Sequence, residues 1–226
     1  MASQNQNTPD ESTVEKLNSH LTKAGTTVAN NKKIIFWAVG AVAVAAAFTL
    51  SYLFIYRNPH LQKSYEAYNK VEINATNDSV AAAQYKEVAD KFKGDAAGNL
   101  AALSAGEALY NEGKYAEAAE YLKRFDCDDE VLNANALILT GDCFVNLKKY
   151  DEALDFYAKA VKECDGNPQI APRALLKEAN IYDEQKKYDK ALECYKTIKN
   201  DFPEFQLGNG LGIDAYIARE EARIAK

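Results

Sequence analysis

Three segments of the chain repeat one short pattern, a lysine and a tyrosine followed by an alanine three residues after the tyrosine. The tyrosines are Tyr115, Tyr150 and Tyr188, and they lie 35 and 38 residues apart. A sequence period of about 20 to 50 residues is typical of small structural units stacked side by side. The chain is therefore expected to fold as an array of similar units.

The clearest unit spans residues 137–160 and predicts two helices joined by a turn. Apolar residues that are three, four or seven positions apart lie on one face of a helix. Such faces are formed by Leu137, Gly141 and Phe144, and then by Ala153, Tyr157 and Ala160. The small Gly141 and Ala153 let the two backbones approach closely, and the aromatic side chains fill the remaining space. Each unit is thus a helical hairpin.

These residues resemble the tetratricopeptide repeat, a helix-turn-helix unit of about 34 residues. The family places a large residue, a glycine and an aromatic on the first helix, and an alanine and an aromatic on the second. The matching packing residues are Gly106, Ala118, Leu137, Gly141, Phe144, Ala153, Tyr157, Leu175, Ala179, Tyr182, Ala191 and Tyr195, with Pro203 closing the last unit. A degenerate unit is expected before them, with helices near 61–73 and 79–92. Three copies in register disfavour a generic helical domain.

A second feature is an uncharged run of 23 residues at 34–56. As a helix with a rise of about 1.5 Å per residue it would extend roughly 34 Å, enough for a bilayer core of about 30 Å. Trp37, Tyr52 and Tyr56 stand near its ends, where aromatic side chains favour the membrane interface. A buried core helix and a cleaved signal peptide are disfavoured, because the run is apolar all round and longer than the roughly 7 to 15 residues of a signal.

The predicted fold class is therefore all-α, with a single N-terminal transmembrane helix followed by a tetratricopeptide-repeat α-solenoid. Three domains are expected: a polar segment at 1–33, the membrane helix at 34–56, and three to four repeats plus a C-terminal capping helix at 57–226. Within the polar segment, Val14, Leu17 and Leu21 follow a capping box at Ser12 and predict a short amphipathic helix. In the capping helix, Ile213, Tyr216, Ile217 and Ile224 are expected to face inward and residues 219–223 outward.

The charge distribution bears on location and on partners. Four lysines precede the membrane run and three basic residues follow it closely, which favours an N-terminus in the cytosol. The repeats of this single-pass protein are then expected across the membrane from the cytosol, in the periplasm if the membrane is a bacterial inner membrane. The net charge of −6 is concentrated in residues 57–226, which disfavours nucleic acid as a partner.

No catalytic or metal-binding pattern is present in the sequence. The cysteines Cys127, Cys143, Cys164 and Cys194 are scattered without a C-x-x-C pair, and the only histidines are far from them. An even number of cysteines permits disulfides, but isolated cysteines on packed helices usually behave as small apolar residues. The sequence predicts no enzyme activity, no cofactor, no metal and no small-molecule substrate.

The family resemblance implies a protein-binding groove lined by the first helix of each hairpin. The residues at these positions are Leu100, Leu103, Glu107 and Tyr110, then Asn135, Ile138, Asp142 and Val145, then Arg173, Leu176, Asn180 and Asp183. Members that grip chaperone C-termini use a Lys and Asn clamp, and here Leu103, Ile138 or Leu176 replaces the lysine. The mixture of apolar and acidic residues suits a polypeptide with apolar and basic side chains.

The layout of a short leader, one anchor and an acidic repeat domain is similar to the YfgM type of ancillary subunit of the bacterial Sec translocon. That resemblance implies association with SecYEG and with a PpiD-type membrane-anchored chaperone, and assistance to newly exported proteins. Two alternatives stay open at this point. One is a structural scaffold subunit of a cell-envelope complex, and the other is an import receptor that faces the cytosol on an organelle.

Overall fold

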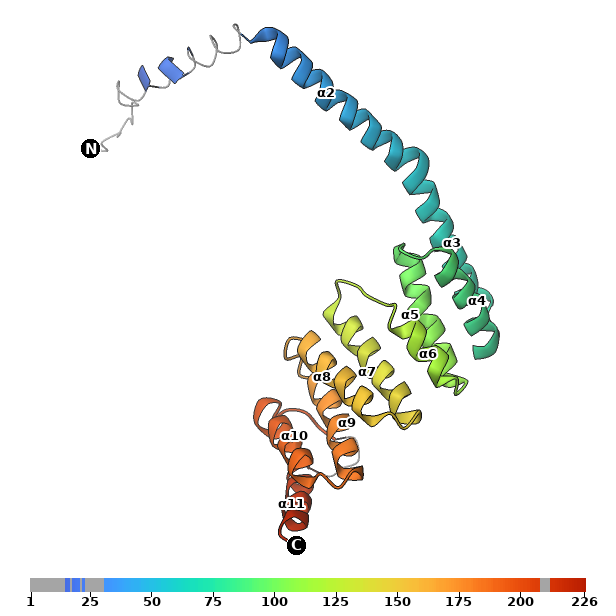
Figure 1. Cartoon of the computed structure of the whole chain (residues 1–226), viewed down its shortest axis with the longest axis vertical. Coiled ribbons are helices and arrows are strands. Elements are labelled where there is room, and N and C mark those ends of the chain that lie inside the picture. The colour runs from blue at the N-terminus through green and yellow to red at the C-terminus, as the bar shows by residue number, and fades with distance from the viewer. Residues whose placement is uncertain (1–14, 17, 21, 23–30, 208–211) are drawn as a thin grey trace, which may run out of the picture. The chain divides into compact units, whose positions relative to one another are not determined.

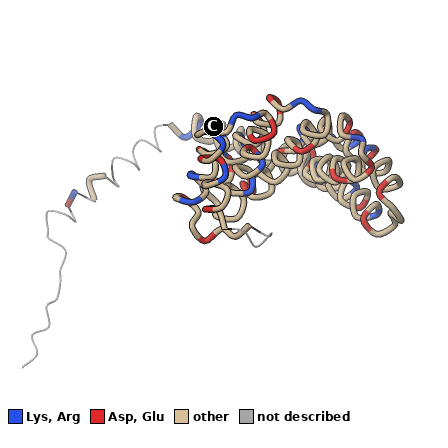
Figure 2. Tube along the Cα trace, turned by 90° about the horizontal axis from the view of Figure 1, so that it is seen from below, with Lys and Arg blue, Asp and Glu red and all other residues tan. Residues whose placement is uncertain are grey.

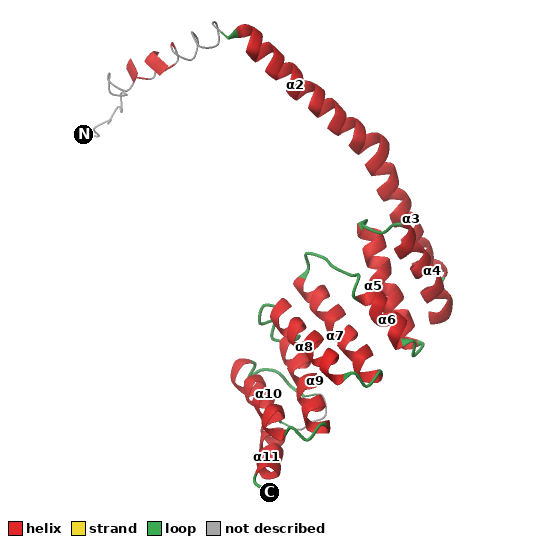
Figure 3. Cartoon of the chain, in the orientation of Figure 1, coloured by secondary structure: helices red, strands yellow, loops and turns green. Residues whose placement is uncertain are grey.

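A computed structural model describes residues 15–16, 18–20, 22, 31–207 and 212–226, and these residues form helices and turns without a strand (Figures 1 and 3). The all-α prediction is confirmed. Ser12, Val14, Leu17 and Leu21 of the predicted amphipathic helix, and residues 208–211 of the last turn, lie outside the described residues. The elements are α2 (Lys32–Ser51), η1 (Tyr52–Arg57), α3 (Asn58–Asn74), α4 (Asp78–Lys91), α5 (Ala96–Asn111), α6 (Tyr115–Leu122), α7 (Glu130–Asn146), α8 (Tyr150–Glu163), α9 (Ala171–Glu184), α10 (Tyr188–Asp201) and α11 (Ile213–Ile224).

The chain divides into two compact units, Met1–His60 and Leu61–Lys226. In the first unit α2 is apolar on all sides, and none of its residues is buried. Phe36 and Trp37 are 74% and 75% exposed. Leaving so much apolar surface in water is unfavourable, and α2 belongs to the one helical stretch among the described residues that is long and apolar enough to cross a membrane.

The apolar helix is not uniform, because η1 is a π-helical turn that ends two residues before Pro59. Its last hydrogen bond joins the Asn58 N–H to the Leu53 carbonyl, five residues back instead of four. A proline has no N–H to donate and its ring crowds the carbonyl of the preceding helical turn. A π turn widens the helix at the place where the regular pattern is disturbed.

The second unit is a series of antiparallel hairpins in which each helix from α4 to α10 packs on the next in chain order (Figure 1). The predicted degenerate unit is present as α3 and α4, where Tyr68 lies against Tyr85 with ring centroids 5.5 Å apart. Asn77 is the N-cap of α4, and its side chain accepts a hydrogen bond of 3.0 Å from the Val80 N–H.

The core of this unit consists of four successive clusters, and the buried residues of each come from three or four consecutive helices. Tyr85 and Phe92 belong to the cluster of α3, α4 and α5, and Leu122 to that of α4, α5, α6 and α7. Tyr157 belongs to the third cluster and Tyr195 to the fourth, which includes α11. Acidic and basic residues are interspersed along the outside of the helices (Figure 2). Each hairpin is therefore stabilised mainly by its neighbours, as in other helical repeats.

Two glycines are required where helices of one hairpin approach each other. A Cβ on Gly141 would lie 2.7 Å from Cδ1 of Tyr157, and a Cβ on Gly106 would lie 2.5 Å from Cγ of Leu122. Both distances are far below van der Waals contact. Gly106 and Gly141 thus lie at close helix contacts. Ala118, Ala153, Ala179 and Ala191 are buried.

The three repeated turns have the same backbone geometry. Gly113, Lys148 and Lys186 occupy equivalent positions after the first helix and have φ values of 76°, 60° and 59°. In each case the next N–H bonds back to the helix, as from Lys149 to the Phe144 carbonyl at 2.9 Å. A left-handed residue followed by such a bond is a common way to end a helix. Glycine suits this position best, and two repeats use lysine there.

Candidate functional site

We call the predicted groove-lining residues of α5, α7 and α9 the A-helix face. The structure corrects this set at two positions, because Leu103 and Ile138 are buried in the core and cannot contact a partner. Glu107, Arg173 and Asn180 are exposed. The remaining members are partly buried and are Leu100, Tyr110, Asn135, Asp142, Val145, Leu176 and Asp183.

Side-chain contacts bring several of these positions together across neighbouring repeats. The Arg173 guanidinium on α9 lies 3.4 Å from Oδ1 of Asn135 on α7. Lys177, also on α9, donates to both oxygens of Asp142 on α7 at 2.8 and 2.9 Å. The first helices of successive hairpins thus lie side by side, as the predicted groove requires.

Asp142 is not the free acidic spot that the sequence suggested. Besides Lys177, the Tyr157 hydroxyl donates to Asp142 Oδ1 at 2.6 Å. The pKa of the Tyr157 phenol is raised, mainly by burial and in second place by this hydrogen bond to the Asp142 carboxylate. The carboxylate therefore joins α7, α8 and α9, and its charge is largely neutralised within the chain. Lys177 was missed in the sequence because its partner is 35 residues away.

Asp183 is engaged in the same way by the last helix. It accepts hydrogen bonds from Arg219, at 2.9 Å, and from Arg223. Between these arginines Glu220 is fully buried and accepts from Nε of Arg219 at 2.6 Å. A buried carboxylate requires such charged donors.

The sequence prediction for α11 is therefore wrong in two respects. Residues 219–223 do not all face solvent, since Glu220 is buried, and Ile224 does not face inward, since it is 49% exposed. Ile217 is buried as predicted, and Ile213 and Tyr216 pack against the same cluster. The helix closes the array with an ion-pair network as well as with apolar contacts.

Comparison with known proteins places this arrangement among helical repeats. A tetratricopeptide repeat model matches residues 173–204, and a model described as anaphase-promoting complex, cyclosome, subunit 3 matches residues 86–160. The fold is a tetratricopeptide-like helical repeat. No curated protein matches the chain in sequence.

Solved structures of MamA resemble the tetratricopeptide-like domain. One is 19% identical, with a TM-score of 0.52, and the match covers 74% of this chain and 88% of that chain. Another is 21% identical, with a TM-score of 0.48, and covers 66% of this chain and 89% of that one. At this level of identity the likeness concerns the fold alone. Repeats of this kind are protein-interaction scaffolds.

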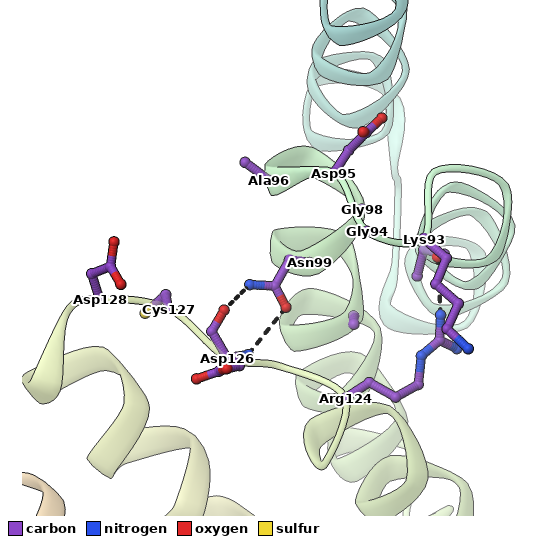
Figure 4. A pocket seen from close by; sticks show the side chains of 12 residues that line it. Lys93, Gly94, Asp95, Ala96, Gly98, Asn99, Arg124, Asp126, Cys127 and Asp128 are labelled. Carbon is purple, nitrogen blue, oxygen red and sulfur yellow. Dashed lines mark hydrogen bonds between the residues drawn. The ribbon is translucent and has the colours of Figure 1, made fainter. Parts of the chain in front are cut away.

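A cavity of about 700 Å³ lies where α4, α5 and the connection from α6 to α7 meet (Figure 4). Two of its polar side chains are bonded within the tetratricopeptide-like domain. The Asn99 amide bonds to the backbone of Asp126, and Arg124 bonds to Asp90 at 2.7 Å and to the Ala89 carbonyl at 2.9 Å. These bonds stabilise the connection between α6 and α7.

The cysteines are free thiols, and Cys143, Cys164 and Cys194 are buried in the tetratricopeptide-like domain. Burial raises the pKa of Cys143 and that of Cys194 to about 12, so both remain protonated at neutral pH. Across the described residues no group of three or more His, Cys, Asp or Glu is arranged to hold a metal ion. The A-helix face is therefore the candidate site.

Proposed function

We propose that this protein is a membrane-anchored adaptor that binds polypeptides on the A-helix face. The proposal is carried by one observation, a tetratricopeptide-like domain in the same chain as α2, an apolar helix with no buried residue. An anchor would keep the repeats in a thin layer beside a bilayer. That confinement raises their effective concentration toward anything that emerges there.

The surface chemistry favours a polypeptide ligand. Glu107 and Asn180 are exposed on the A-helix face and offer hydrogen-bonding groups. Leu100, Val145 and Leu176 are partly buried beside them and offer apolar contact. Extended or helical segments with apolar side chains match such a mixture. Because Asp142 and Asp183 are already paired, the preference for basic side chains rests on Glu107.

The more specific role that we propose is assistance to exported proteins at the Sec translocon. It is supported by the layout shared with YfgM-type subunits, and it implies SecYEG and a PpiD-type chaperone as partners. In this arrangement the protein is a single-pass component of a bacterial inner membrane, with its N-terminus in the cytosol and its repeats in the periplasm. The adaptor itself is non-catalytic.

Site-specific photocrosslinking tests the binding face. A photoreactive amino acid at Glu107 or Asn180 is expected to capture a stalled exported polypeptide in membranes. The matched control is Lys162, which is exposed on α8 outside the A-helix face. Equal capture from all three positions, or capture of lipid alone, would contradict the proposed face.

Two measurements test the membrane orientation and the association with the translocon. Protease added to spheroplasts should digest the repeats, whereas a cytosolic domain would be protected. Purification in mild detergent should yield SecYEG in amounts that fall with salt. A stoichiometric complex that resists high salt would instead favour the scaffold alternative.

A further inference from the structure

A second surface combines two stacked aromatic rings with three lysines. Phe144 of α7 and Phe156 of α8 have ring centroids 5.3 Å apart and planes inclined by 8°. Lys123 and Lys149 lie 5.8 and 5.9 Å from the centroid of Phe144, and Lys159 lies 4.9 Å from that of Phe156. We call these five residues the lysine–phenylalanine surface.

The three lysines differ from others in the same unit. Lys86 pairs with Glu117 at 2.8 Å, and Lys177 pairs with Asp142 at 2.8 Å. Over the described ranges, no carboxylate lies within ion-pair distance of the lysines of the lysine–phenylalanine surface. Contact with an aromatic face offsets only part of the cost of an unpaired charge. The charges of these three lysines are therefore available to an external anion.

A cavity of about 410 Å³ adjoins this surface between α6, α7 and α8. Lys123, Lys159, Asp126 and Glu163 are the charged residues that line it. Asn133, which also lines it, accepts a hydrogen bond of 3.1 Å from the Cys127 N–H in the neighbouring connection. The apolar part of the lining consists of Leu122, Phe125, Ala136, Leu137 and Phe156. The cavity is large enough for one apolar side chain beside the lysines.

The preceding repeat contains a matching arrangement that is already occupied. Tyr121 and Arg124 stand 35 residues before Phe156 and Lys159, at the same positions of the repeat. The Arg124 guanidinium lies 4.8 Å from the centroid of Tyr121. There Asp90 of α4 accepts a hydrogen bond of 2.7 Å from Arg124 and one of 3.1 Å from the Tyr121 hydroxyl.

The comparison between the repeats indicates what the second arrangement lacks. In the first, a carboxylate from the preceding hairpin neutralises the cation above the ring. In the second, Phe156 has no hydroxyl, and Lys159 has no such carboxylate within the part of the chain that the structure describes. The missing group is thus an anionic one supplied from outside.

We propose that the lysine–phenylalanine surface binds an acidic polypeptide segment of a partner protein. A carboxylate of that segment pairs with Lys159 and Lys123, and an adjacent apolar side chain enters the cavity between α6, α7 and α8. Asp126 and Glu163 line the same cavity and repel a second carboxylate placed there, so an apolar residue next to a single acidic one fits best. This surface is separate from the A-helix face and does not depend on its function.

Peptide binding to the full chain in non-ionic detergent tests this inference. The probe is a fluorescein-labelled peptide whose acidic residues, single glutamates next to leucine, are separated by uncharged residues, and binding is measured by fluorescence anisotropy at low salt. Lys159→Glu is expected to weaken binding at least tenfold, because it replaces attraction by repulsion. The matched control, Lys162→Glu, makes the same charge change on the same helix outside the cavity and should change affinity less than twofold.

A second variant separates the apolar contact from the charge. Phe156→Leu keeps an apolar side chain and the net charge, and we expect it to weaken the peptide several-fold without changing the salt dependence of binding. Unfolding midpoints of all variants establish that each is folded. Glu107→Lys on the A-helix face should leave the affinity of the acidic peptide within twofold, so that failure of either surface is recognised separately.

Several results would overturn the inference. Equal weakening by Lys162→Glu would mean that only net charge matters. Equally tight binding of a peptide with lysine in place of its acidic residues would exclude carboxylate recognition. Binding to vesicles with 30% anionic lipid, lost in Lys159→Glu while the peptide does not bind, would assign the surface to a membrane instead.

Discussion

Glu178 should make the stability of this protein depend on pH. It lies on α9, where its Oε2 is 4.0 Å from the sulfur of Cys194 on α10. Both line a cavity of about 330 Å³ together with Leu175, Tyr182, Lys190, Glu193 and Thr197. Burial raises the pKa of the Glu178 carboxyl from 4.5 to about 7.

The sign follows from the proton that the native state retains. Between pH 4.5 and 7 the folded protein binds a proton at Glu178 that the unfolded chain has lost. This contribution to stability is therefore present below about pH 4.5 and is lost as the pH rises through 7. At about 1.4 kcal/mol per pKa unit the full shift corresponds to about 3 kcal/mol. Residual solvent contact of Glu178 reduces the expected loss between pH 5 and 8 to about 2 kcal/mol.

The perturbation is Glu178→Gln, which keeps the size of the side chain and removes its ionisation. We expect the variant to unfold at higher urea concentration than the wild type at pH 8 and at a similar concentration at pH 5. Urea unfolding of the full chain in detergent, followed by circular dichroism at pH 5, 6.5 and 8, measures the difference directly.

Glu193→Gln is the matched control, because Glu193 lines the same cavity but is exposed. It should leave the pH dependence of the unfolding free energy as it is in the wild type. If Glu178→Gln retains the wild-type dependence, or if Glu193→Gln abolishes it equally, the assignment of the effect to burial of Glu178 is wrong.

Three further urea-unfolding experiments test a turn, a packing contact and an ion pair. Lys148→Gly relieves a left-handed backbone that glycine adopts freely, and should raise the free energy of unfolding by about 0.5 to 1 kcal/mol; no gain would contradict the strain. Gly141→Ala should lower it by about 1 to 3 kcal/mol, because its Cβ meets the Tyr157 ring, although alanine favours helices. In a double-mutant cycle, Asp142→Ala and Lys177→Met should couple by about 0.5 to 3 kcal/mol, whereas additive effects would exclude a stabilising pair.

The packing positions could be predicted from the sequence because they obey local rules. Gly141 and Ala153 recur at helical spacing, and the structure places both at the close approach of two helices. The A-helix face was less predictable. A helical period shows which side of a helix faces the core, but it does not show how many positions on either side of that face are also buried. Both Ile138 and Arg173 were expected to line the groove. In the structure Ile138 is buried, whereas Arg173 is exposed.

The ion-pair networks could not be predicted from the sequence pattern. Glu220 between Arg219 and Arg223 has the same sequence signature as a solvated face, and only the position of Asp183 on another helix makes it a buried site. Likewise, Lys148 in a left-handed turn carries no local signal, since glycine is expected there.

The core is divided into four clusters, each shared by three or four consecutive helices, and this division determines how the domain responds to a destabilising substitution. A destabilising substitution in one cluster weakens the adjoining hairpins. Its effect on stability decreases with distance along the array, because helices further away contribute no side chains to that cluster. The end at α11 can therefore open while α4 to α6 stay folded. A partner that clasps several hairpins at once would suppress this fraying, so its binding should slow amide exchange far beyond the residues it touches.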